Sequence, residues 1–178
     1  MSHKFATLFL SFLLCIILIY SCDDGESPPS DAVLISYDQM KTTVGYDWVE
    51  AKMDEYNPKE GVISEIKQVY NPEKHSFVIF SKPSCSCDES SIPIAYFLKI
   101  IFSAEIPESK YSLYTMQSVK SNHPFTDKIT LSALPDMYVI TDSVWSVSFR
   151  KKMTDYIAGH PNEDTVTYEQ LILDELKK

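Results

Sequence analysis

The sequence predicts an α/β sandwich in which helices pack against a mixed central sheet. Residues 75–81 (HSFVIFS) form a short apolar run that is typical of a buried central strand. Residues 91–102 are apolar on nearly all sides, and residues 111–117 alternate as a strand does. Residues 119–132 are mixed and favour no element. A strand, a helix and a second strand, followed by a hairpin and a last helix, indicate the α/β class.

The segment 91–102 fits a strand or a helix by its apolar pattern alone. Its length favours a buried helix, and the acidic Asp88-Glu89 pair before it suits the positive end of a helix. Pro93 then falls in the first turns, where proline is tolerated, or kinks the helix.

The second half of the chain carries a predicted hairpin and a final helix. Residues 137–141 and 144–149 read as strands joined by a two-residue polar turn. Residues 167–176 form an amphipathic pattern that begins with Thr167 and Gln170 at the spacing of a capping box. The hairpin and helix therefore complete the sandwich.

The domain is expected to span residues 33–178 without an internal repeat. Residues 33–35 suggest a short strand, and residues 46–56 and 61–70 place apolar side chains at helical spacing. The part before about residue 60 is a helical extension of the same domain.

Composition excludes several classes of function. The 178 residues carry a net charge of −9 and one arginine, so a basic face for nucleic acid is not expected. Four scattered glycines form no G-x-G-x-x-G or P-loop pattern, which argues against a nucleotide cradle.

Residues 1–21 have the layout of a secretory leader. One positive charge, Lys4, precedes the apolar run 5–20, and an acidic segment follows directly after Cys22. The 16-residue run is shorter than the roughly 20 residues of a comfortable membrane span. An uncleaved anchor is the alternative to removal.

Residues 19–22 (IYSC) resemble a bacterial lipobox. The resemblance implies cleavage before Cys22 and lipid attachment to it, and several acyl chains hold a protein firmly in a membrane. The acidic residues behind Cys22 resemble the surface-export signal of Bacteroidetes lipoproteins. Residues 22–32 are polar and proline-rich, as a flexible tether is. The expected location is the cell envelope, at the outer membrane, with membrane lipid as a partner.

Two cysteines remain for chemistry after this processing. Cys15 leaves with the leader and Cys22 carries lipid, so Cys85 and Cys87 are left, in a compartment that permits disulfides. They stand between the predicted central strand and the next helix. A helix N-terminus stabilises a thiolate, which is the nucleophile of thiol–disulfide exchange.

The stretch 77–88 (FVIFSKPSCSCD), with Pro93 and Pro135, resembles the thioredoxin-like fold over about residues 61–176. The resemblance implies a three-layer sandwich with helices flanking the sheet. It implies a cis peptide bond before Pro135, facing the cysteines. Cys85 would be the attacking thiol and Cys87 the resolving one, acting on thiols or disulfides of exported proteins without a cofactor.

The motif departs from the family pattern in three ways. Cys-x-Cys replaces Cys-x-x-Cys, and a disulfide across one residue closes a small ring that favours oxidation or isomerisation. The strand 77–80 carries no acid for proton transfer. Asp136 follows Pro135, and a carboxylate beside a thiolate would raise the thiol pKa.

Two other readings of the cysteine pair stay open. The disulfide can be a structural staple in a redox-inactive binding lipoprotein. The two thiolates also suit Cu(I), with Met137 or His75 as helpers. The histidines do not supply the spacing of a zinc site.

Other charged residues are expected at solvated positions. Asp174 and Glu175 fall on the predicted last helix, His123 reads as a loop residue, and the basic run 150–152 falls at a strand end. Contact of that run with lipid headgroups is the alternative to a solvated turn.

Overall fold

The computed structural model describes residues 31–85, 89–159 and 167–178. The leader, Cys22 and Cys87 lie outside the described residues. The described elements are β1 (Val33–Ile35), α2 (Tyr37–Thr42), α3 (Val49–Glu55), α4 (Glu60–Val69), β2 (His75–Ser81), α5 (Pro93–Ser103), β3 (Tyr111–Thr115), β4 (Asp136–Thr141), β5 (Val144–Trp145), α6 (Phe149–Gly159) and α7 (Tyr168–Leu176), with 3₁₀ turns at Glu89–Ser91 and Glu108–Lys110.

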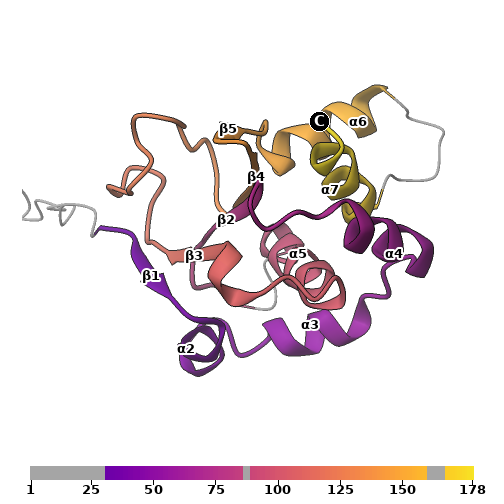
Figure 1. Cartoon of the computed structure of the whole chain (residues 1–178). Helices are drawn as coiled ribbons and strands as arrows, with labels where there is room; N and C mark the ends of the chain where they lie inside the picture. Colours follow the sequence, from indigo (N-terminus) through magenta and orange to yellow (C-terminus); the bar gives the residue numbers. More distant parts are fainter. Residues whose placement is uncertain (1–30, 86–88, 160–166) are drawn as a thin grey trace, which may run out of the picture.

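The described strands form one mixed sheet in the order β1-β3-β2-β4-β5 (Figure 1). β2 runs parallel to β3 and antiparallel to β4, while β1 and β5 are antiparallel edge strands. α5 connects the parallel pair, which cannot be joined by a tight turn. The predicted class, a mixed α/β sandwich with a buried central strand at residues 75–81, is confirmed.

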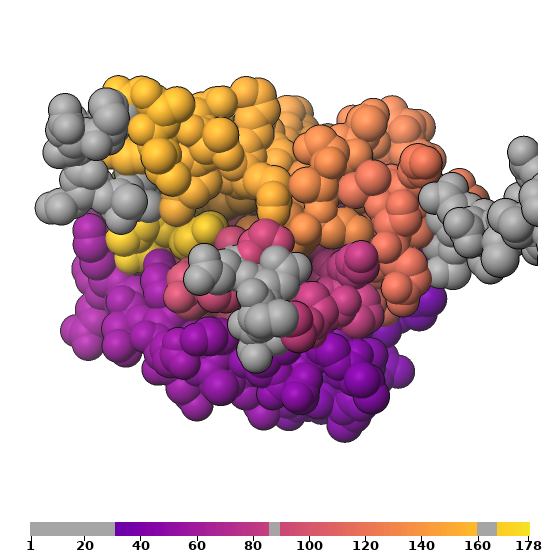
Figure 2. Space-filling model, turned by 180° about the vertical axis from the view of Figure 1, so that it is seen from behind, coloured from indigo at the N-terminus to yellow at the C-terminus, as the bar shows by residue number. Residues whose placement is uncertain are grey.

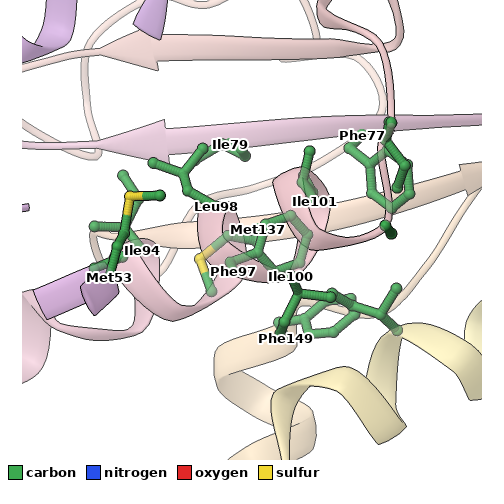
Figure 3. Packing of buried hydrophobic residues seen from close by; sticks show 14 of the residues in the cluster. Met53, Phe77, Ile79, Ile94, Phe97, Leu98, Ile100, Ile101, Met137 and Phe149 are labelled. Atoms are coloured by element: carbon green, nitrogen blue, oxygen red, sulfur yellow. The ribbon is translucent and has the colours of Figure 1, made fainter. Parts of the chain in front are cut away.

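One face of the sheet, which carries Phe77 and Ile79, is covered by helices. Figure 3 shows Leu98 of α5 beside Ile79 of β2. Phe149, the first residue of α6, meets Phe97 of α5 edge to face, with ring centroids 5.2 Å apart. Each large side chain that is fully buried here contributes about 1.5–3 kcal/mol to stability. α5 is therefore anchored all along its length, and its N-terminal end is fixed in place.

The opposite face is covered differently. Phe80 and Tyr138 pack there with Phe125, Trp145 and Leu131, and no described helix contributes to this second cluster. The chain between β3 and β4 lies over it as turns and irregular segments. Among the described residues, helices therefore cover one face of the sheet, and turns and irregular segments cover the other. Serines, threonines and two prolines in this segment oppose helix formation, and its apolar and aromatic side chains bury the face without a helix.

Two other element predictions need correction. The strand predicted at 144–149 ends at Trp145, because Ser148 turns the chain into α6 and accepts a hydrogen bond from the Lys151 N–H at 3.2 Å. The Thr167–Gln170 capping box is also wrong: Thr167 is the N-cap residue of α7, but its side chain makes no capping hydrogen bond. The predicted helix at 61–70 and the strand at 33–35 are confirmed as α4, shifted by one residue, and β1.

In the described part of the chain, no helix has the length and apolar character that crossing a membrane requires.

Candidate functional site

Cys85 lies at the end of the loop that leaves the central strand β2. The side chain is exposed, and its sulfur takes part in a disulfide. It stands four residues after Ser81, the last residue of β2. The predicted resolving residue, Cys87, and the predicted lipid carrier, Cys22, lie outside the described residues. The structure thus places an exposed, disulfide-bonded cysteine four residues beyond a buried strand.

The sequence predicted the cysteines at the start of the helix that follows β2, but Cys85 lies eight residues before the first residue of that helix. α5 begins at Pro93, and the 3₁₀ turn Glu89–Ser91 precedes it. Proline at the first position of α5 explains the late start, since its ring fits there and clashes farther along a helix. The Ser84 and Ser91 hydroxyls lie 2.9 Å apart, so the loop before Cys85 still contacts the start of the helical region.

Pro135 lies at the same end of the sheet as this loop. The Leu134–Pro135 peptide bond is cis, as the sequence predicted. Phe80 of β2 pairs with Asp136 of β4, so Pro135 stands level with the end of β2. Pro135 and Pro93 line one pocket of about 270 Å³, which we call the α6 pocket because α6 forms its other wall. In Figure 2, magenta atoms from the middle of the chain lie between the indigo N-terminal part and the orange part farther along the chain.

On its other side, the loop before Cys85 is held by three residues that we call the N-terminal clamp: Gly45, Tyr46 and Trp48. Gly45 accepts a hydrogen bond from the Ser84 N–H at 3.0 Å. Its φ of +92° is a conformation that other residues rarely adopt, and a Cβ there would lie 2.8 Å from the Pro83 Cβ. Only glycine therefore allows the two backbone segments to approach so closely.

Trp48 adds a side-chain bond to the same loop. Its indole N–H donates to the carbonyl oxygens of Ser84 and Gly45, both at 3.0 Å. The ring is buried in the helix-side core, so it is fixed by packing before it bonds the loop. The residue immediately before Cys85 is thereby held through both its N–H and its carbonyl.

Tyr46 anchors the clamp to the sheet. Its hydroxyl lies 2.7 Å from the Ser81 hydroxyl and 2.8 Å from the Thr115 hydroxyl, at the ends of β2 and β3. Burial raises the pKa of Tyr46, so the phenol remains protonated and able to donate. The predicted helix at 46–56 begins only at Val49, because Tyr46 and Trp48 lie in the turn before it.

Asp136 is buried and engaged locally. Its carboxylate accepts hydrogen bonds from the Ser148 hydroxyl at 2.7 Å, the Tyr138 hydroxyl at 2.9 Å and the Met137 N–H at 2.9 Å. Burial raises the pKa of Asp136, and these hydrogen bonds oppose the rise. Asp136 and Tyr138 alternate with Met137 along β4, so they project to the face opposite α5. The sequence predicts that Asp136 raises the pKa of a neighbouring thiol. In the structure its carboxylate is engaged by three donors of its own surroundings.

His75 and Met137, the residues considered as additional Cu(I) ligands, do not lie together in the structure. His75 begins β2 at the end opposite Cys85, about 20 Å from Ser81 at ~3.3 Å per strand residue. Its Nδ1 accepts from the Asn71 N–H at 3.0 Å. Met137 is buried beside the α6 pocket. Within the described ranges, no group of three or more His, Cys, Asp or Glu side chains is placed to hold a metal ion.

Several residues expected in solvent are buried. His123 packs against Phe80, with ring centroids 4.9 Å apart. Glu175 is buried and pairs with Lys152 and Lys178, and Lys152 lies on α6, not at a strand end. Burial, with repulsion from Lys178, lowers the pKa of Lys152 to about 8. Sequence spacing could not reveal the His123–Phe80 and Lys152–Glu175 contacts, because the two partners of each contact come from different segments of the chain.

No protein-family model, curated protein or solved structure matches this chain. The function must therefore be argued from the geometry around Cys85.

Proposed function

We propose that this chain is an exported, lipid-anchored protein with a thioredoxin-like domain, which performs thiol–disulfide exchange through Cys85 and Cys87. Cys22 is the lipid carrier, residues 22–32 are the tether, and exported protein thiols or disulfides are the substrates. The location that follows is the cell envelope, at the outer membrane.

The order and direction of the elements support the thioredoxin-like reading. A parallel pair, β2 and β3, is joined by α5, and the antiparallel hairpin of β4 and β5 adds to the β2 side. A cis-proline precedes β4. The structure adds α6 between the hairpin and the last helix, where the resemblance implies a single helix.

One observation carries the proposed chemistry: Cys85, an exposed residue whose sulfur takes part in a disulfide, follows a loop that other contacts already hold. The loop is already fixed by the Trp48 indole, the Gly45 backbone and the Ser84–Ser91 contact. A structural staple would be expected to join segments that otherwise lack such contacts. Exchange chemistry instead requires a sulfur that is accessible and held in one position.

The reaction is balanced by the substrate. A thiolate of the exported substrate attacks the disulfide of this chain. A mixed disulfide forms, and the second sulfur of this chain is released as a thiolate. A second substrate thiolate attacks the mixed bond, so the substrate gains a disulfide and the protein becomes a dithiol. Each substrate disulfide formed removes two electrons from the substrate and leaves them on the two protein thiols. In the reverse direction, the dithiol of this chain reduces a wrong disulfide of the substrate. The forward steps then oxidise a different pair of substrate cysteines, so the substrate disulfide is isomerised.

The proposal is tested by the reactivity of the reduced protein. We expect iodoacetamide at neutral pH to label Cys85 before Cys87, as read by mass spectrometry of the digested protein. We also expect glutathione disulfide to restore the protein disulfide, and a Cys85→Ser variant to lose this reaction. Equal, slow labelling of both thiols and no reaction with glutathione disulfide would leave the redox-inactive binding lipoprotein as the better account.

A further inference from the structure

The α6 pocket has a wall that the resemblance does not explain. Arg150, Met153, Thr154 and Ile157 line it from α6, the helix that has no counterpart in the implied order of elements. Their spacing places them along one face of that helix. Pro93 and Pro135 form the facing wall, and Ser90 also lines the pocket. The next residue, Ser91, contacts Ser84, which directly precedes Cys85, so the pocket lies near the loop that carries Cys85.

The size and lining of the pocket favour a side chain as its occupant. Its volume of about 270 Å³ lies below the roughly 300–1,000 Å³ that is typical of sites for whole small molecules. Methionine, proline and isoleucine side chains line much of it. Ile157 remains 52% exposed, although it is a large apolar residue. An apolar side chain that entered the pocket would cover it.

Arg150 gives the pocket a charge. It is the sole arginine of the chain, and it forms no ion pair with any carboxylate in the described ranges. Tyr168 also lines the pocket. Burial raises the pKa of Tyr168, and the positive charge of Arg150 opposes that rise. The planar fork of donors of a guanidinium matches a carboxylate, and no described carboxylate pairs with this one.

We propose that the α6 pocket binds an apolar side chain of the polypeptide that exchanges its disulfide at Cys85, and that Arg150 binds an acidic residue next to it. This inference deepens the proposed function and rests on it. The preferred substrate is thus an exported protein segment in which a cysteine is followed by a large apolar residue and an acidic one.

The test uses short peptides in which a cysteine is followed by Leu-Glu, Ala-Glu or Leu-Lys, and cysteine-free copies with serine in its place. Calorimetry with the disulfide form of the protein measures the affinity for the cysteine-free peptides. For the cysteine-containing peptides, the rate of mixed-disulfide formation is measured. We expect Leu-Glu to exceed both alternatives by about tenfold, the usual size of discrimination by one apolar pocket or one ion pair.

Matched variants separate recognition from general damage. Arg150→Glu should reverse the preference between Leu-Glu and Leu-Lys, whereas Lys151→Glu, the same charge change one residue along α6, should not. Ile157→Asp should abolish the preference for leucine. Its control is Val147→Asp, because Val147 is 51% exposed and lies outside this pocket.

The outcomes distinguish the two proposals. Exchange with glutathione disulfide but no preference among peptides would overturn the pocket assignment and leave the proposed function standing. Binding of cysteine-free peptides with the expected preference but no exchange would overturn the proposed function and support the pocket as a peptide site. Equal effects of the control variants would overturn the pocket assignment.

Discussion

The loop that carries Cys85 has two different flanks. On one side the N-terminal clamp holds it by backbone and indole hydrogen bonds and by a contact that only glycine permits. On the other side lies the α6 pocket, with a half-exposed isoleucine and an arginine that no described carboxylate pairs. The closed flank fixes the sulfur in space, while the open flank is available to another molecule. Mutations on the first should cost stability, and mutations on the second should cost recognition.

The largest effect is expected at Gly45. Gly45→Ala places a Cβ against the rigid ring of Pro83 and forces an unfavourable backbone conformation, so it should destabilise the protein by about 2–4 kcal/mol. Urea unfolding followed by tryptophan fluorescence measures the loss. Gly61→Ala is the control, because a Cβ at Gly61 meets nothing within 4 Å and Gly61 lies in α4. It should stabilise by up to ~1 kcal/mol, and a similar loss in both variants would contradict the clamp.

A smaller effect is expected at Glu169, which secures the chain just after the clamp. Glu169 is buried, accepts from the Lys59 N–H at 3.0 Å and is bonded by the Tyr56 hydroxyl. Burial alone would raise the pKa of Glu169, but these hydrogen bonds outweigh it and the pKa is lowered from 4.5. Glu169→Gln should cost about 1–2 kcal/mol at pH 7.

The pH dependence gives this prediction its sign. A lowered pKa means that Glu169 contributes stability above about pH 4.5, which is lost as the pH falls through its folded pKa. The deficit of the Gln variant should therefore shrink in acid. Asp136 has the opposite shift, so its contribution is most favourable below 3.8 and declines as the pH rises through its folded pKa. The stability lost in Glu169→Gln and in an Asp136→Asn variant, measured by urea unfolding across pH 3–7, should change with pH in opposite directions, and changes in the same direction would refute the assignment.

The smallest effect on stability is expected on the open flank. Ile157→Asp changes a side chain that is 52% exposed, and surface changes of this kind usually stay within about 0.5 kcal/mol. The urea midpoint should therefore match that of the unmodified protein. A loss comparable to that of Gly45→Ala would show that α6 supports the fold and is no recognition surface.

The predictable part of this structure is the part governed by local pattern. The central strand at 75–81 and the buried helix after it follow from their apolar runs, and cis Pro135 follows from the resemblance. The covering of the second sheet face was not predictable, because Phe125 and Leu131 reach it from a segment without periodicity. α6 was missed because residues 144–149 alternate like a strand, and the cap at Ser148 outweighs that alternation.

The candidate site divides in the same way. Cys85 and Pro135 could be named from the sequence, since each has a residue-type signature at a fixed place. The clamp could not, because Gly45 and Trp48 act on Ser84 across nearly forty residues of chain. Their only local sign is a glycine followed by two aromatic residues within four positions, which also reads as the start of a helix.

The most direct measurement for the central claim is the trapping of mixed disulfides by a Cys87→Ser variant in the cells that make the protein. Without a resolving thiol, Cys85 should accumulate covalent adducts with exported proteins, seen on non-reducing gels and released by dithiothreitol. A Cys85→Ser variant, which keeps Cys87 two positions along the chain, should yield far fewer. Adducts that are absent from both variants, or equally abundant in both, would contradict thiol–disulfide exchange through Cys85.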